Sequence, residues 1–169
     1  MMQMLSAGGL AILTDGLRSP DEDNPRGYFE LEAVKATPTD RSWLQNAPGK
    51  AVKVIHLLLA DLPAEYEYRV LFMQRPLDQI LRSQKAMLSR SGRRGPASDQ
   101  QLTKVFTRQV VQVRAWLDLQ SNFRVLEVEY DDCLREPFAA AARVNAFLGG
   151  TLDERAMAAA AEQGLRRQR

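Results

Sequence analysis

The chain has 169 residues, of which 45% are hydrophobic and 26% charged, and its formal net charge is +2. This length suits one domain, residues 1–169, with a real hydrophobic core, and the composition is ordinary for a globular protein. The only cysteine, Cys133, excludes an internal disulfide and a cysteine-rich metal site, and the only histidine, His56, argues against a histidine-based metal cage.

The first third of the chain predicts short elements separated by loops. We expect a helix at Met1–Ala7, ended by Gly8-Gly9, and then a short strand at Leu10–Leu13. A loop rich in Asp, Pro and Gly follows over Thr14–Gly27. The remaining short elements are helices at Tyr28–Ala36, Arg41–Gln45 and His56–Leu62 and a strand at Ala51–Ile55.

The segment Tyr68–Gln84 combines a buried strand with polar side chains. The apolar run Val70–Met73 predicts a parallel strand covered on both faces, and Pro76 suits the first turn of a following helix. Arg75 then lies at the carboxyl end of the strand, with Ser83 about two helical turns further on. Ligands bind at this edge of open α/β sheets, and a guanidinium and a hydroxyl there suit a phosphate. The alternative is an arginine at a strand end and a solvated serine.

The second half of the chain alternates helices and strands. A basic, glycine-rich loop at Ser89–Ser98 precedes an amphipathic helix at Asp99–Gln120 and a strand at Arg124–Tyr130. Two further helices are expected at Pro137–Leu148 and Leu152–Glu162. This alternation predicts an α/β domain with three layers, in which helices flank both faces of a mainly parallel sheet.

Two of these segments resemble motifs of the sulfotransferases, enzymes that use 3′-phosphoadenosine 5′-phosphosulfate (PAPS). A strand followed by Arg75 and, eight positions later, Ser83 resembles their 3′-phosphate-binding segment. Tyr130-Asp131-Asp132, with Phe147-Leu148-Gly149 further on, is similar to their Tyr-Glu-Asp-Leu and Phe-Leu-Gly segments. The resemblance implies a P-loop NTPase-like (sulfotransferase) fold, phosphate contacts from Arg75 and Ser83, and an adenine contact from Tyr130. Asp131 and Asp132 are more simply explained as helix-capping carboxylates.

The resemblance also suggests two candidates for a catalytic base. His56 is followed by Leu62-Pro63, as is the catalytic histidine of cytosolic sulfotransferases, although Lys53 lies one position further away than the lysine of that family. Histidine near its ordinary pKa can take a proton from an acceptor hydroxyl. Glu30 is similar in position to the glutamate base of several bacterial sulfotransferases, and Glu32 is a weaker candidate.

Each candidate base has a structural alternative that the sequence leaves open. His56 at a strand–helix junction could be bonded to the backbone, and Glu30 could be a first-turn glutamate favoured by the helix dipole. Only one of the two groups is needed as a base.

One departure from the family is expected to matter. Sulfotransferases open with a strand and a Pro-x-Ser-Gly-Thr loop that holds the 5′-phosphosulfate, and no such loop occurs in this sequence. We therefore expect a family member truncated at its N-terminus, with a reading frame that continues upstream of Met1. We expect the remaining chain to be marginally stable, with an apolar gap between strands, and to carry out no transfer by itself.

The function that the resemblance implies is transfer of a sulfuryl group from PAPS to a hydroxyl or amine of a small-molecule or carbohydrate acceptor, without a metal. One alternative is a catalytically silent nucleotide-binding or protein-interaction module. Another is a P-loop kinase-like enzyme, although the glycine-rich loop with lysine that such enzymes use is missing. No apolar run reaches the roughly 18 residues of a membrane span and no signal peptide is evident, so a cytoplasmic protein without nucleic-acid partners is expected.

Overall fold

The structure is a computed structural model that describes residues 1–21, 24, 27–77, 79 and 99–165, with only the backbone described for 99 and 162–165. Ser83, most of the helix expected after Pro76 and the basic loop at Ser89–Ser98 lie outside the described residues. No helix in the described part of the chain is long and apolar enough to cross a membrane.

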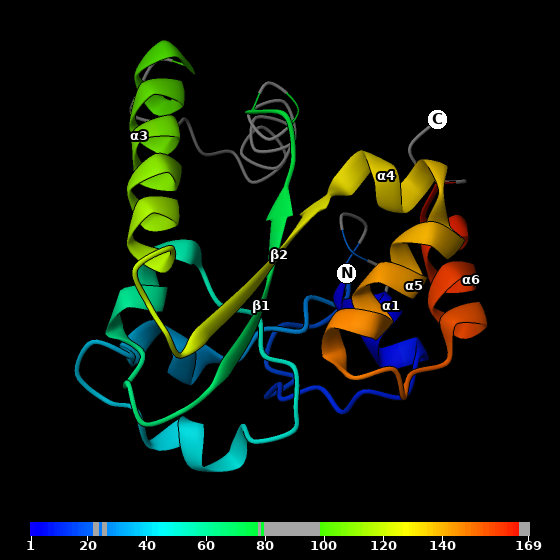
Figure 1. Ribbon diagram of the computed structural model, residues 1–169, viewed down its shortest axis with the longest axis horizontal. Coiled ribbons are helices and arrows are strands. Elements are labelled where there is room, and N and C mark those ends of the chain that lie inside the picture. Colours follow the sequence, from blue (N-terminus) through cyan, green and yellow to red (C-terminus); the bar gives the residue numbers. More distant parts are fainter. Residues whose placement is uncertain (22–23, 25–26, 78, 80–98, 166–169) are drawn as a thin grey trace.

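A pair of parallel strands lies at the centre of the fold (Figure 1). β1 (Tyr68–Gln74) pairs with β2 (Phe123–Glu129) along its whole length. Parallel neighbours require a long crossover connection, and this one contains the helix α3 (Asp99–Leu117). Both strands were predicted from their apolar patterns, but β2 ends one residue earlier than expected, because Tyr130 already begins a helix.

The other two predicted strands pair with each other at one point only. Ile12 and Ala51 form a parallel bridge. Its hydrogen bonds run from the N–H of Leu13 to the Ala51 carbonyl, 2.9 Å, and from the N–H of Ala51 to the Ala11 carbonyl, 2.8 Å. The described pairings are thus all parallel, as predicted, but they do not join into one sheet, and within the described residues β1 has a strand neighbour on one edge only.

Helices make up most of the remaining structure. The described residues also form the α-helices α1 (Met2–Ala7), α4 (Tyr130–Arg135), α5 (Pro137–Leu148) and α6 (Glu154–Leu165). Gly149 follows α5 with a φ of 116°, a left-handed conformation that glycine adopts at no steric cost. The three short helices predicted between Tyr28 and Leu62 are instead 3-10 turns: η1 (Glu32–Ala36), η2 (Ser42–Asn46) and η3 (His56–Asp61). They are too short, and lack the side-chain caps, to offset the cost of nucleating an α-helix.

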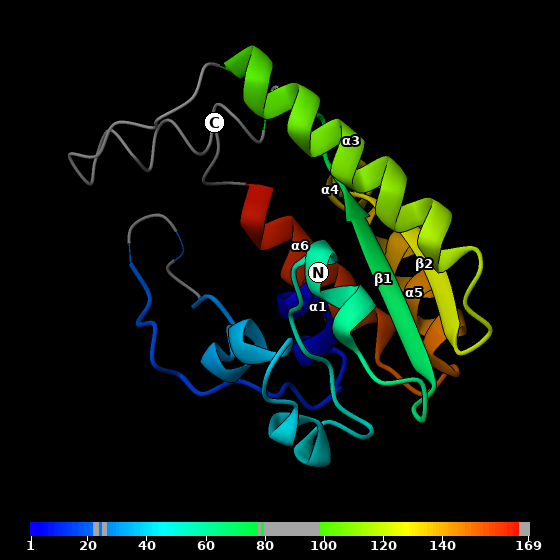
Figure 2. The same ribbon diagram turned by 90° about the vertical axis from the view of Figure 1, so that its left-hand side faces the viewer.

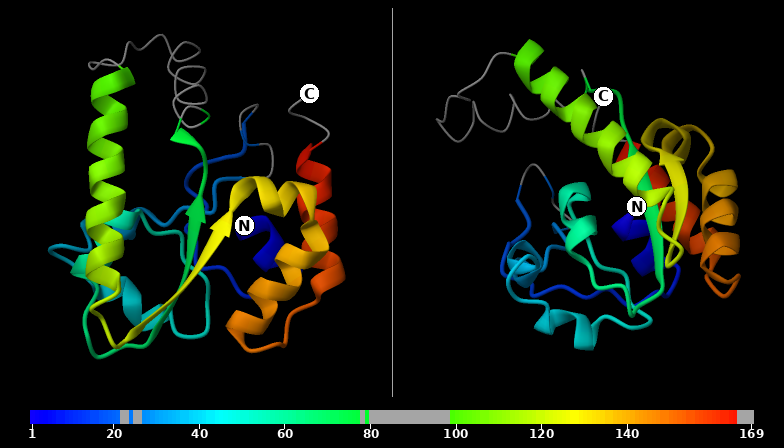
Figure 3. Two further views of the ribbon diagram at one scale, coloured as in Figure 1. Left: turned by 45° about the horizontal axis from the view of Figure 1, so that its top comes forward. Right: turned by 60° about the vertical axis from the view of Figure 1, so that its left-hand side comes forward.

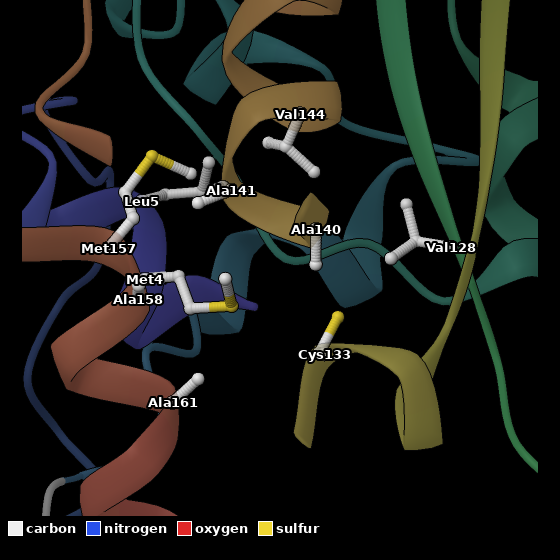
Figure 4. Packing of buried hydrophobic residues seen from close by; sticks show 10 residues of the cluster. All are labelled: Met4, Leu5, Val128, Cys133, Ala140, Ala141, Val144, Met157, Ala158 and Ala161. Carbon is white, nitrogen blue, oxygen red and sulfur yellow. The ribbon is translucent and has the colours of Figure 1, made fainter. Parts of the chain in front are cut away.

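Helices cover both faces of the β1–β2 pair, as the sequence predicted (Figures 1 and 2). Alternation along β1 directs Phe72 towards α3, where it packs with Leu117 and Phe123. Leu71 and Val128 face the opposite way, into a cluster formed with α1, α4, α5 and α6. Figure 4 shows side chains from α1, α5 and α6 converging in this second cluster. The fold is therefore α/β, with the sheet as the middle layer.

The N-terminal end of α3 extends past the carboxyl end of β1 (Figures 2 and 3). The segment that contains Ala51 lies beside β1 and α3. Val54 and Leu62 pack both with the cluster formed by Phe72, Leu117 and Phe123 and with a small cluster around Trp43.

The α1–α6 contact provides a test of the core. Met157 has 0% of its surface exposed, and a Cβ on Gly8 would lie only 2.6 Å from the Met157 Cγ atom, so the packing there is tight. We expect Met157→Ala to lower the free energy of unfolding by about 2–5 kcal/mol, measured by urea denaturation. Leu119→Ala, at a residue that is 82% exposed, should change it by less than about 0.5 kcal/mol. Equal stability of the two variants would contradict this description of the core.

Candidate functional site

Arg75 and Tyr130 meet at the carboxyl ends of the two strands. The last pair in register between the two strands is Gln74 with Glu129, and neighbouring strands lie about 4.8 Å apart. The residues that follow this pair, Arg75 and Tyr130, therefore lie beside each other. The Arg75 Cζ atom lies 4.6 Å from the centroid of the Tyr130 ring, which is a cation–π contact. Such contacts are worth about 0.5–2 kcal/mol, depending on their exposure to solvent. Two of the predicted cofactor-binding residues are thus adjacent.

A hydrogen-bonded chain fixes the other side of the Arg75 guanidinium. Its Nε–H donates to Gln79 Oε1 at 3.1 Å, and Gln79 Nε2 donates to Asp131 Oδ2 at 3.4 Å. Gln79 was not among the residues predicted from the sequence. The only local signal is its spacing of four residues from Arg75 across a helix start, which brings two side chains to the same face.

The aspartates after Tyr130 lie at a helix start, as predicted, but they do not cap it. Asp131 and Asp132 are in the first turn of α4, where negative charge is favoured by the helix dipole. Neither side chain makes a capping hydrogen bond: Asp131 accepts from Gln79, and Asp132 pairs with Arg135. The predicted capping role is therefore wrong, and the position at the helix start is right.

We call Arg75, Gln79, Tyr130 and Asp131 the C-terminal rim. Within the described residues, the Nη1 and Nη2 groups of Arg75 make no hydrogen bond, while its Nε is engaged. A paired set of guanidinium N–H groups matches two oxygens of a phosphate or sulfate. The rim also lies where open α/β sheets bind ligands. Its arrangement therefore suits an anionic ligand with an oxyanion group.

Glu30 lies in a separate cluster of charges. Its carboxylate is 2.9 Å from Lys53 Nζ and 3.5 Å from Arg18 Nη1. The Arg18 guanidinium in turn stacks on the ring of Tyr28, 3.3 Å from the centroid. Partial burial alone would raise the pKa of Glu30, but the hydrogen bond and charge of Lys53, assisted by Arg18, outweigh it and lower the pKa. Glu30 is therefore an ionised, paired carboxylate.

The backbone before Glu30 is held in an uncommon conformation. Phe29 has a φ of 51°, in the left-handed region that side chains other than glycine rarely adopt. Such strain persists only where the surroundings hold the chain. Here the Glu30 carbonyl accepts hydrogen bonds from Thr14 Oγ1 at 2.7 Å and from the Asp15 N–H at 3.3 Å. Glu30 precedes η1 rather than lying in its first turn, so the alternative of a dipole-stabilised first-turn glutamate is wrong.

His56 begins η3, directly after the segment that pairs with residues 11–13. Its ring meets the ring of Phe106, on α3, edge to face with centroids 5.3 Å apart. Its Nε2 atom is buried and has no hydrogen-bond partner among the described residues. Desolvation lowers the pKa of His56, so the imidazole is neutral at pH 7.

The predicted site residues thus fall into distinct groups. Arg75 and Tyr130 are in contact, Glu30 is paired with Lys53, and His56 packs on α3. The hydrogen bonds and ion pairs of the described residues do not link Glu30 or His56 to the rim. The part of the chain that the structure describes also contains no group of three or more acidic, histidine or cysteine side chains that could hold a metal.

Comparison with known proteins does not assign this arrangement to a family. No family model, curated protein or solved structure matches the chain.

The partly buried histidine predicts a pH dependence of stability. Because the pKa of His56 is lower in the folded chain than in the unfolded chain, the unfolded chain binds protons more readily, and stability falls as the pH falls below about 6.5. We expect the wild type to lose more unfolding free energy between pH 7.5 and pH 5.5 than His56→Gln does, measured by urea denaturation. The N-terminal amine, whose pKa burial also lowers, is common to both proteins. An identical pH slope would show that His56 is not desolvated.

Proposed function

We propose that this protein binds PAPS through the C-terminal rim and transfers its sulfuryl group to a hydroxyl or amine of a small-molecule or carbohydrate acceptor. The observation that carries the proposal is the Arg75 guanidinium, stacked on Tyr130 with Nη groups that have no partner among the described residues. By the sulfotransferase resemblance, these groups would bind the 3′-phosphate, and the aromatic ring would lie beside the adenine.

The proposed reaction needs a base but no redox change. A lone pair of the acceptor oxygen or nitrogen forms a bond to sulfur while the bridging S–O bond breaks, and adenosine 3′,5′-bisphosphate leaves. The acceptor proton passes to a base. Of the two candidates, His56 is neutral with an unbonded Nε2, whereas Glu30 has a lowered pKa and its carboxylate is already engaged by Lys53. His56 is therefore our preferred base, and its buried Nε2 must be uncovered to reach an acceptor.

The wider expectations belong to the same proposal. They are a P-loop NTPase-like fold, a cytoplasmic location, and PAPS as a co-substrate used without a metal. The loop with which that family holds the 5′-phosphosulfate has no counterpart in this sequence. The described residues consequently support nucleotide binding more directly than they support transfer.

A catalytically silent nucleotide-binding module is the second candidate. It is favoured by the state of the two possible bases, since Glu30 is paired with two cations and the Nε2 atom of His56 is buried. The two candidates share the rim and differ in turnover, so binding and turnover must be measured separately.

A binding measurement tests nucleotide binding at the C-terminal rim, which both candidate functions share. A charge-assisted contact between Arg75 and a phosphate is worth about 1.5–3 kcal/mol, so Arg75→Ala should weaken the binding of adenosine 3′,5′-bisphosphate by roughly one to two decades in calorimetry. Adenosine 5′-phosphate, which lacks the 3′ group, should be insensitive to the change. Arg108→Ala, at an exposed position on α3, is the matched control. Equal losses for the two nucleotides would make Arg75 a structural residue.

Turnover identifies the base. In a version of the protein that carries a phosphosulfate-binding loop ahead of Met1, His56→Ala should reduce the transfer of label from radioactive PAPS by about 10²–10⁴, with nucleotide affinity nearly unchanged. Glu30→Gln should have this effect instead if Glu30 is the base. Wild-type turnover in both variants would remove both residues from the mechanism, and no transfer by any version would favour the silent module.

A further inference from the structure

The hydrogen-bonded chain through Gln79 can run in only one direction. The Nε of Arg75 is only a donor, and the carboxylate of Asp131 is only an acceptor. The amide between them must therefore present its oxygen to Arg75 and its nitrogen to Asp131, as the two hydrogen bonds of 3.1 Å and 3.4 Å require. Among uncharged side chains, an amide supplies an acceptor and a donor of this kind at its two ends.

This neutral link keeps a carboxylate away from the guanidinium. A direct ion pair between Asp131 and Arg75 would neutralise the cation. It would also place a negative charge beside the ligand's oxyanion, and the two like charges would repel each other. With Gln79 between them, Asp131 orients the amide, while Arg75 keeps its full charge. The Nη groups of Arg75 remain without a partner among the described residues.

The same link restricts the motion of a long side chain. An unrestrained arginine loses up to about 2 kcal/mol of rotamer entropy when it is fixed, and a site already ordered before binding avoids that loss. Here the face of the guanidinium rests on Tyr130 and its Nε is bonded to Gln79. Gln79 itself is anchored twice, through its backbone N–H to the Pro76 carbonyl at 3.0 Å and through its side chain to Asp131.

We infer that Gln79 is a positioning residue, which fixes the Arg75 guanidinium with its Nη edge open to the ligand's phosphate and separates it from Asp131. This role rests on the proposed function, because it requires that the ligand carry a phosphate bound by Arg75. Gln79 needs no contact with the ligand.

The test compares three variants of the 169-residue chain by calorimetry with adenosine 3′,5′-bisphosphate. Gln79→Met keeps the length of the side chain and removes the hydrogen bonds, so affinity should fall about two- to tenfold. Gln79→Glu places a carboxylate against Arg75 and should lower affinity further. Gln112→Met, the same chemical change at an exposed position on α3, should leave affinity unchanged. Binding of adenosine 5′-phosphate should not change in any of them.

Two further measurements separate positioning from a general structural effect. In the Arg75→Ala background, Gln79→Met should cause no additional loss of affinity, because the two residues act as one unit. In NMR relaxation of the labelled Arg75 Nε–H group, the unliganded wild type should show a rigid side chain, and Gln79→Met should show a mobile one.

The outcomes distinguish this inference from the proposed function. If the wild type binds adenosine 3′,5′-bisphosphate and Gln79→Met binds it equally well, Gln79 has no positioning role, while the proposed function stands. A mobile Arg75 Nε–H in the wild type also overturns the inference, whatever the affinities are. A rigid Nε–H in a chain that binds neither nucleotide overturns the proposed function, and with it the phosphate as the ligand.

Discussion

The parallel pairing of β1 with β2 is the constraint on which the rest of the structure depends. It buries alternate side chains on opposite faces, with Phe72 towards α3 and Leu71 towards the helices of the other layer. A parallel pair is stable only when both faces are covered, so the two hydrophobic clusters and the central strands depend on each other. The same register brings Arg75 beside Tyr130 where the strands end.

Electrostatics distinguishes the rim from the charged cluster around Glu30. In the rim, a cation is held by an aromatic face and a neutral amide, and no carboxylate among the described residues pairs with it. In the other cluster, Lys53 and Arg18 are both directed at a single carboxylate, whose negative charge is thereby compensated. An arginine whose Nη groups have no partner among the described residues is suited to binding an anion, whereas a carboxylate with engaged oxygens is poorly suited to accepting a proton.

The neighbourhood of His56 shows how packing and chemistry compete at one residue. Its contact with Phe106 ties the end of the Ala51–Ile55 segment to α3 and removes water from the imidazole. The lowered pKa keeps the ring neutral, which a base requires, while the burial that causes it also covers Nε2. Burial of the ring therefore both keeps His56 neutral and restricts access to its Nε2 atom.

The sequence by itself determined the elements whose signals are local. The apolar run of β1, the proline and glycine that bound α5, and the periodicity of α3 are properties of neighbouring residues. These elements formed close to where they were expected, although α3 ends at Leu117 rather than Gln120. It did not determine that the short segments before Leu62 would be 3-10 turns, or that the strand segments at 10–13 and 51–55 would form a single bridge. Only the tertiary structure decided the register that joins Arg75 to Tyr130, the link through Gln79 to Asp131, and the pairing of Glu30 with Lys53. These contacts join residues far apart in the chain, and packing between elements, which no local pattern records, fixes them.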